Sequence, residues 1–276
     1  MGRPTQIAAL VERYDAFFLD AYGVLVDVAG ARPGARELLA ELERRGKPWC
    51  VLTNGASRLP EAAARRWGGL GLEIPAARVV TSGSLLAGHF AAHALAGLPC
   101  AVLGPPDSAR YVERAGGVVV RPGEDCAVLV VADETGFAFP QDIDAILTAL
   151  FARLERGDPV HLVLPNPDLV YPTAPGALGL TAGAIAVMIE AALSARLHGR
   201  APPRFVALGK PQAAIFEEGV RRVGTRNALM IGDQLETDTR GALACGLDAA
   251  LVSGGVSVEH SAHDGLIPTW RLASLL

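Results

Sequence analysis

The chain has few cysteines and no close pair among them. Its 276 residues include four, which are scattered through apolar surroundings with no C-x-x-C spacing: Cys50, Cys100, Cys126 and Cys245. This usage is typical of buried, reduced thiols and excludes a disulfide framework. We therefore expect a cytoplasmic protein.

Basic stretches, membrane spans and internal repeats are lacking as well. The chain carries 25 Lys and Arg against 29 Asp and Glu, a net charge of −4, and shows no basic stripe, so nucleic acid is excluded as a partner. The uncharged stretch from Tyr171 to Ile189 is broken by prolines and glycines, so it does not predict a bilayer helix. Glu12 and Asp15 lie where a signal peptide would be apolar. We expect no membrane association.

What the sequence does contain is an alternation of apolar strands and helices. Half of its residues are hydrophobic, enough for a large core. Such alternation predicts an α/β fold with a doubly wound parallel sheet and helices on both faces. The strands expected in this core are Tyr14 to Asp20, Trp49 to Thr53, Phe205 to Leu208, Ala228 to Gly232 and Ala249 to Ser253.

A second domain is expected inside this core. Between Thr53 and Lys210 lies far more chain than one crossover needs, and it shows its own strand and helix alternation. The domains predicted from this pattern are a core of residues 1–82 and 180–276 and an inserted α/β domain of residues 83–179.

Polar residues that can do chemistry follow the predicted core strands. The run Phe-Phe-Leu-Asp20-Ala-Tyr22-Gly delivers a carboxylate to a strand end, and Thr53 ends the next strand. Further along come Lys210, in Leu-Gly-Lys-Pro, and Asp233, in Met-Ile-Gly-Asp-Gln-Leu-Glu-Thr-Asp238. The carboxyl ends of parallel strands are where open α/β sheets bind ligands, and an aspartate placed there can act as a nucleophile or a metal ligand.

These four segments, in this order, resemble motifs I to IV of the haloacid dehalogenase (HAD) superfamily. The length and place of the insertion resemble the class II, NagD-like branch, in which an α/β cap follows motif II. Pro165-Asn166-Pro167-Asp168 resembles a segment near the exit of that cap. Motif I departs from the phosphatase pattern D-x-D-G, because Tyr22 stands where the second aspartate is expected.

The resemblance implies a set of catalytic roles. Asp20 is the expected nucleophile, which forms an aspartyl phosphate. Thr53 and the backbone at Asn54 and Gly55 hold the phosphate, and Lys210 neutralises its charge.

The resemblance also implies a Mg²⁺ cofactor. Its ligands are the side chains of Asp20 and Asp233 and the backbone carbonyl of Tyr22, a group that any residue supplies. Asp238 orients Lys210 or a metal-bound water. Asn166 and Asp168 are substrate contacts or, equally, turn formers.

Tyr22 changes the expected activity. The residue it replaces protonates the leaving group and then activates water, a role that contributes about 10² to 10⁴-fold in rate. A phenol, with an ordinary pKa of about 10, is a poor substitute near neutral pH. We therefore expect a slow or atypical phosphatase that acts on a small phosphorylated metabolite. By resemblance it forms a homodimer through the cap.

Two other functions stay open at this point. Asp-Ala-Tyr-Gly also resembles motif I of the 2-haloacid dehalogenases, which use no metal, although those enzymes carry a helical cap and a less acidic motif IV. Asp233 and Asp238, without a cation, would raise the pKa of Asp20 and weaken it as a nucleophile. The third reading is a non-catalytic protein that binds a phosphorylated metabolite for regulation.

Overall fold

The computed structural model describes residues 2–174, 176–197, 201–253 and 265–276, which form two compact units. None of the described helices is long and apolar enough to cross a bilayer. The core unit comprises Met1–Thr53, Pro60–Thr81 and Lys210–Leu276. The inserted unit comprises Asn54–Leu59 and Ser82–Gly209.

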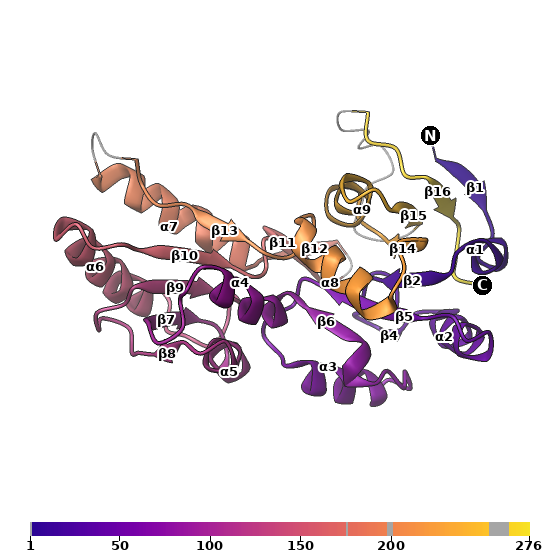
Figure 1. Ribbon diagram of the computed structural model, residues 1–276, viewed down its shortest axis with the longest axis horizontal. Coiled ribbons are helices and arrows are strands. Elements are labelled where there is room, and N and C mark those ends of the chain that lie inside the picture. The colour runs from indigo at the N-terminus through magenta and orange to yellow at the C-terminus, as the bar shows by residue number, and fades with distance from the viewer. Residues whose placement is uncertain (1, 175, 198–200, 254–264) are drawn as a thin grey trace. The chain divides into compact units, whose positions relative to one another are not determined.

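The core unit is built on a sheet of seven strands that all pair in parallel. β2 lies inside this sheet, between β14 and β5 (Figure 1). Parallel pairing brings the carboxyl ends of these three strands to one edge. In spatial order the strands are β1 (Arg3–Thr5), β16 (Trp270–Leu272), β15 (Asp248–Val252), β14 (Ala228–Gly232), β2 (Ala16–Leu19), β5 (Trp49–Thr53) and β6 (Val79–Thr81).

Helices cover both faces of this sheet, and successive side chains of its buried strands pack against opposite faces. Phe17 and Leu19 of β2 pack in one apolar cluster with α1 (Ile7–Arg13), α2 (Ala35–Arg44) and α3 (Pro60–Gly68). On the other face α8 (Ala213–Val223) approaches so closely at Gly219 that a Cβ there would lie 3.0 Å from the Phe18 ring. The smaller elements are the antiparallel hairpin β3 (Val26–Asp27) and β4 (Gly30–Ala31), the 3-10 turn η1 (Ala76–Arg78), the π-helical turn η3 (Leu235–Thr239) and α9 (Arg240–Ala244).

The inserted unit has its own parallel sheet of five strands. In spatial order they are β13 (Phe205–Ala207), β10 (His161–Leu164), β9 (Val128–Val131), β7 (Pro99–Leu103) and β8 (Val118–Val119). Val128 and Val130 pack with α4 (Leu86–Ala92) and α5 (Pro106–Arg114). Leu129 and Val131 pack with α6 (Gln141–Glu155) and α7 (Ala182–Arg196) on the opposite face (Figure 1). The 3-10 turn η2 (Ser82–Leu85) and the antiparallel hairpin β11 (Val170–Ala174) and β12 (Ala177–Leu180) complete this unit.

The predicted α/β class with parallel sheets is confirmed, but two predictions about the insertion are wrong. The strand expected in the core sheet at Phe205 to Leu208 is β13, which pairs with β10 in the inserted unit. The expected return to the core at residue 180 occurs after Gly209, because α7 buries Ile185, Ile189 and Leu193 in the apolar cluster of the inserted sheet. An apolar run predicts a buried element but not which of two sheets it joins.

Candidate active site

Asp20 lies at the carboxyl end of β2, an interior strand of the core sheet. The four residues of β2 before it are buried, and its backbone N–H continues the ladder by donating to the Ile231 carbonyl, 2.9 Å away. Its Oδ1 accepts a hydrogen bond from the Ala21 N–H at 2.8 Å. With 5% of its surface exposed, the Asp20 carboxylate is fixed in position.

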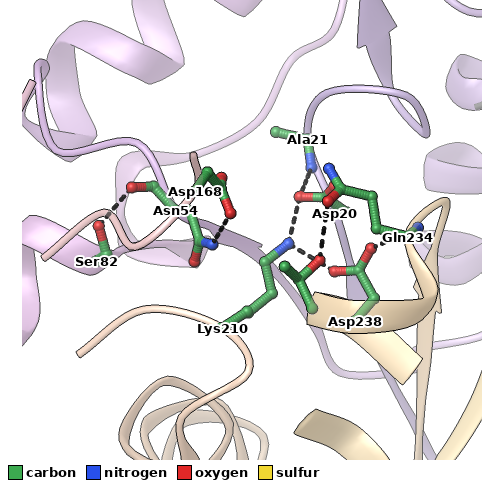
Figure 2. Close-up of polar contacts among 9 residues, drawn as sticks. Asp20, Ala21, Asn54, Ser82, Asp168, Lys210, Gln234 and Asp238 are labelled. Carbon is green, nitrogen blue, oxygen red and sulfur yellow. Dashed lines mark hydrogen bonds and ion pairs between the residues drawn. The ribbon is translucent and has the colours of Figure 1, made fainter. Parts of the chain in front are cut away.

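Lys210 connects Asp20 with Asp238. Its ammonium donates to Asp20 Oδ1 at 2.6 Å and to Asp238 Oδ1 at 2.7 Å (Figure 2). The second oxygen of Asp238 accepts the Gln234 N–H at 3.1 Å. Lys210 and Asp238 are 2% and 1% exposed, so these are buried, charge-assisted bonds.

Asp233 directly follows β14 and completes a cluster of three carboxylates. Oxygens of Asp20, Asp233 and Asp238 all lie within 4.8 Å of one another. Gly23 makes room for Asp233: its φ is +89°, and a Cβ there would lie 2.1 Å from Asp233 Oδ2. The sequence reading did not single out Gly23, although a glycine closely following a strand-end aspartate is a signal that could have identified it.

The charges of this cluster are unbalanced. Burial raises the pKa of Asp20 well above its usual range, the Lys210 ammonium lowers it, and the Asp238 and Asp233 charges raise it further. Burial disfavours the charged form of Lys210, but the Asp20 and Asp238 carboxylates outweigh it, so the pKa of Lys210 is raised. Three carboxylates against one ammonium leave an excess of two negative charges when all are ionised.

This donor set fits a divalent cation. Carboxylate oxygens are the ligands that Mg²⁺ and Ca²⁺ prefer, and the described cluster contains neither a thiolate nor an imidazole. A charge of +2 would balance the excess of two negative charges. Gly23 keeps clear the space beside Asp233 that a side chain would otherwise fill.

Tyr22 is half-buried and lies beside the β3–β4 hairpin, bridging to Val26. Burial raises the pKa of its phenol, the Asp27 charge raises it further, the Val28 backbone lowers it, and the Asp233 charge raises it. The phenol is therefore protonated at neutral pH and cannot replace a carboxylate as a general base.

Thr53 ends β5 of the core unit, paired with Thr81 in the ladder. The residues after it belong to the inserted unit by their contacts. There the Asn54 amide donates to Asp168 Oδ1 at 2.8 Å, and Ser82 Oγ donates to the Asn54 carbonyl at 2.6 Å (Figure 2). Gly55 is partly exposed.

Asn166 and Asp168 lie in the turn between β10 and β11, and Asn166 connects this turn to the start of α7. The Asn166 amide donates to Thr181 Oγ1 at 3.1 Å, and Asn166 Oδ1 accepts the Asp168 N–H at 3.1 Å. Thr181 in turn caps the N-terminus of α7. The turn-forming reading of these two residues is therefore present in the structure, and substrate contact by them stays a prediction.

The fold and the cluster together define a class of protein. A parallel α/β sheet carries a buried aspartate at the end of an interior strand, clustered with a lysine and two further carboxylates, and this arrangement is typical of hydrolases with an α/β fold.

Comparison with known proteins identifies the family. Residues 17–117 match the family described as haloacid dehalogenase-like hydrolase, and residues 207–275 match a second HAD-hydrolase-like family. The chain is 33% identical to mouse chronophin over 86% of its own length and 82% of that protein. It is 28% identical to a dihydroxyacetone phosphatase of Corynebacterium glutamicum (strain R), over 88% and 82% of the two chains. The chain belongs to the haloacid dehalogenase-like hydrolases, which confirms the predicted class II capped HAD hydrolase.

Solved structures agree with this assignment. A possible sugar phosphatase of the HAD superfamily from Cytophaga hutchinsonii superimposes with a TM-score of 0.86 at 28% identity, covering 100% of this chain and 99% of that one. A glycerol phosphate phosphatase from Mycobacterium tuberculosis, solved with magnesium, gives a TM-score of 0.79 at 26% identity, covering 96% and 77%.

Proposed function

We propose that the protein is a slow Mg²⁺-dependent phosphatase of small phosphorylated metabolites that works through an aspartyl phosphate. The observation that carries this proposal is the buried cluster in which Lys210 bridges Asp20 and Asp238 next to Asp233. The names of its relatives, which include a dihydroxyacetone phosphatase and a glycerol phosphate phosphatase, support small phosphate esters as the substrate class.

In the first step Asp20 attacks phosphorus. A bond forms between an Asp20 oxygen and phosphorus, and the bond from phosphorus to the ester oxygen breaks. Thr53 and the backbone amides of Asn54 and Gly55 hold the phosphate oxygens, and Lys210 offsets their charge. Asp238 keeps Lys210 in place through the 2.7 Å bond. In the second step a water oxygen bonds to phosphorus, the bond from phosphorus to the Asp20 oxygen breaks, and the water gives its proton to solvent, which releases inorganic phosphate and the Asp20 carboxylate.

The cation would be held by Asp20, Asp233 and the Tyr22 carbonyl. When bound, Mg²⁺ supplies positive charge for the phosphate oxygens during transfer. The proposal of Mg²⁺ rests on the oxygen-only donor set and on the excess of two negative charges in the described cluster.

Tyr22 sets the rate in this proposal. With no carboxylic acid at position 22, the leaving alkoxide takes its proton from water, and no side-chain base activates the water of the second step. The missing group is worth about 10² to 10⁴-fold, or about 3 to 5 kcal/mol of transition-state stabilisation.

A panel of substrates tests the proposal. Alkyl and aryl phosphates and 2-chloropropionate are each incubated with the native protein in Mg²⁺ or in a chelator, with Asp20→Asn as the inactive control. We expect phosphate release in Mg²⁺ alone and no chloride in either condition. Chloride release in the chelator would establish the dehalogenase function instead. Phosphate ester binding without turnover would establish the regulatory one.

We also propose a homodimer formed through the inserted unit. The stretch 169–189 carries no charged residue, and it exposes Leu178 and Leu180 on β12 together with Val187 and Met188 on α7. Exposed apolar side chains of this kind can pack against the same side chains of a second copy across a two-fold axis. Sedimentation is expected to give twice the chain mass of 28.7 kDa. Leu178→Asp should yield monomers, and Phe139→Asp, which alters another exposed apolar side chain of this unit, should not.

A further inference from the structure

The segment Asn54–Leu59 packs in a different unit from the residues on either side of it in sequence. It connects β5 with α3, which are both in the core unit, yet it packs within the inserted unit. This segment directly follows Thr53 and contains Asn54 and Gly55, the residues proposed to hold phosphate. We call it the 54–59 loop.

Residues in the first turns of helix α5, in the inserted unit, form hydrogen bonds with this loop. Ser108 Oγ donates to the Ala56 carbonyl at 2.9 Å, although the two residues are 52 positions apart in sequence. The Tyr111 hydroxyl donates to the Arg58 carbonyl at 2.6 Å. Asp107 Oδ2 accepts the Leu59 N–H at 3.0 Å. Three of the six residues of the loop are thereby hydrogen-bonded to a single helix.

The start of the loop is held independently. Ser82 Oγ donates to the Asn54 carbonyl at 2.6 Å, and Asp168 accepts the Asn54 amide at 2.8 Å. The loop is therefore fixed at both ends by groups of the inserted unit.

These contacts lie away from water. Ser108 and Ala56 are 0% exposed, and Tyr111 is 4% exposed. The Tyr111 ring is also fixed by packing, since a Cβ on Gly83 would lie 2.5 Å from it. Replacement of Tyr111 by phenylalanine should therefore remove the hydroxyl bond and leave the ring in place.

We propose that Ser108 and Tyr111 are positioning residues for phosphate binding: they hold the 54–59 loop in the conformation in which its backbone amides meet the phosphate. This inference rests on the proposed function. A loop that is ordered before the ligand arrives loses less conformational entropy on binding, so its affinity is higher. Phosphate is held by the same amides before and during transfer, so the effect falls on substrate affinity more than on turnover.

Two variants and a control test the proposal in the full chain. Ser108→Ala and Tyr111→Phe each remove one hydroxyl that is bonded to a loop carbonyl. Ser194→Ala is the control, because Ser194 Oγ also donates to a carbonyl of the inserted unit, that of Glu190 at 2.7 Å, but within α7. Each test variant is expected to raise KM for an aryl phosphate and the inhibition constant of inorganic phosphate by about 3 to 10-fold, with kcat changed less than twofold.

Hydrogen exchange separates this inference from the proposed function, because it needs no substrate. Amides of residues 54–59 are expected to exchange at least about tenfold faster in the Ser108→Ala, Tyr111→Phe double variant than in the native protein or in Ser194→Ala. Unchanged exchange would overturn the role of α5. Faster exchange of these amides with an unchanged inhibition constant for inorganic phosphate would overturn the link between loop order and phosphate binding. A native protein that neither binds inorganic phosphate nor hydrolyses any ester would refute the proposed function, while the exchange result would still decide whether α5 positions the loop.

Discussion

Replacement of Lys210 by methionine should destabilise the core unit strongly in the absence of divalent cations. Lys210 donates to Asp20 at 2.6 Å and to Asp238 at 2.7 Å, and it is 2% exposed. Methionine fills much of the same volume but removes the ammonium that pairs with the buried carboxylates of Asp20 and Asp238. Removal of one partner from a buried ion pair costs about 3 to 5 kcal/mol, and we expect a loss of this size in the free energy of unfolding.

The measurement can be confined to the core unit, because all three tryptophans, Trp49, Trp67 and Trp270, lie there. Denaturant unfolding in a chelator, followed by tryptophan fluorescence, therefore reports this unit. The control is Lys47→Met, at the only other lysine of the sequence. Lys47 donates at 2.8 Å to a backbone carbonyl, that of Tyr14, so we expect its replacement to lower the free energy of unfolding by about 1 kcal/mol. Equal losses in the two variants would refute the reasoning about the buried cluster.

Three further predictions concern the cation, position 22 and the thiols. Millimolar Mg²⁺ should raise the melting temperature of the native protein, and Asp233→Asn should abolish most of that increase; an equal increase in the variant would place the ion elsewhere. Tyr22→Asp should raise the rate of alkyl phosphate hydrolysis by about one to three orders of magnitude. Tyr22→Asn should not, because asparagine has the shape of aspartate but carries no acid. Equal rates in the two variants would exclude the carboxylate as the missing group. Burial raises the pKa of Cys50 to about 12, so Cys50 holds almost no thiolate at pH 8. Cys245 is partly exposed, and in a thiol titration it should react before Cys50. Fast reaction of Cys50 would contradict its buried position in the sheet.

The members of the buried cluster could be predicted from sequence for a simple reason. Asp20 and Asp233 each follow an apolar strand, and parallel strands bring such positions to one edge of a sheet. Lys210 follows a strand that was expected in the core sheet but pairs in the inserted one, and Asp238 lies in the turn η3, so both were placed by the resemblance. The hydrogen bonds from Lys210 to Asp20 and Asp238 are present in the structure, and Asp233 lies in the same carboxylate cluster. The catalytic roles of these residues stay proposals.

The sequence was less informative about the inserted unit. Nothing in the residues 54–59 shows that they pack on α5, because their partners Asp107, Ser108 and Tyr111 lie 48 to 53 positions away. The edge strand β1 and its neighbour β16, with three residues each, are too short to show a periodicity. β13 was assigned to the wrong sheet because a short apolar run has no signal for its pairing partner.

The most direct test of the aspartyl-phosphate mechanism is a rapid-mixing experiment with p-nitrophenyl phosphate in Mg²⁺. This leaving group needs little protonation, so Asp20 should be phosphorylated quickly, whereas water attack on the intermediate lacks a base because Tyr22 offers none. We predict a burst of about one nitrophenol per chain followed by slow turnover. Acid quench and borohydride reduction should convert Asp20 to homoserine, detected in its peptide by mass spectrometry. Steady turnover without a burst and with unmodified Asp20 would contradict the proposed mechanism.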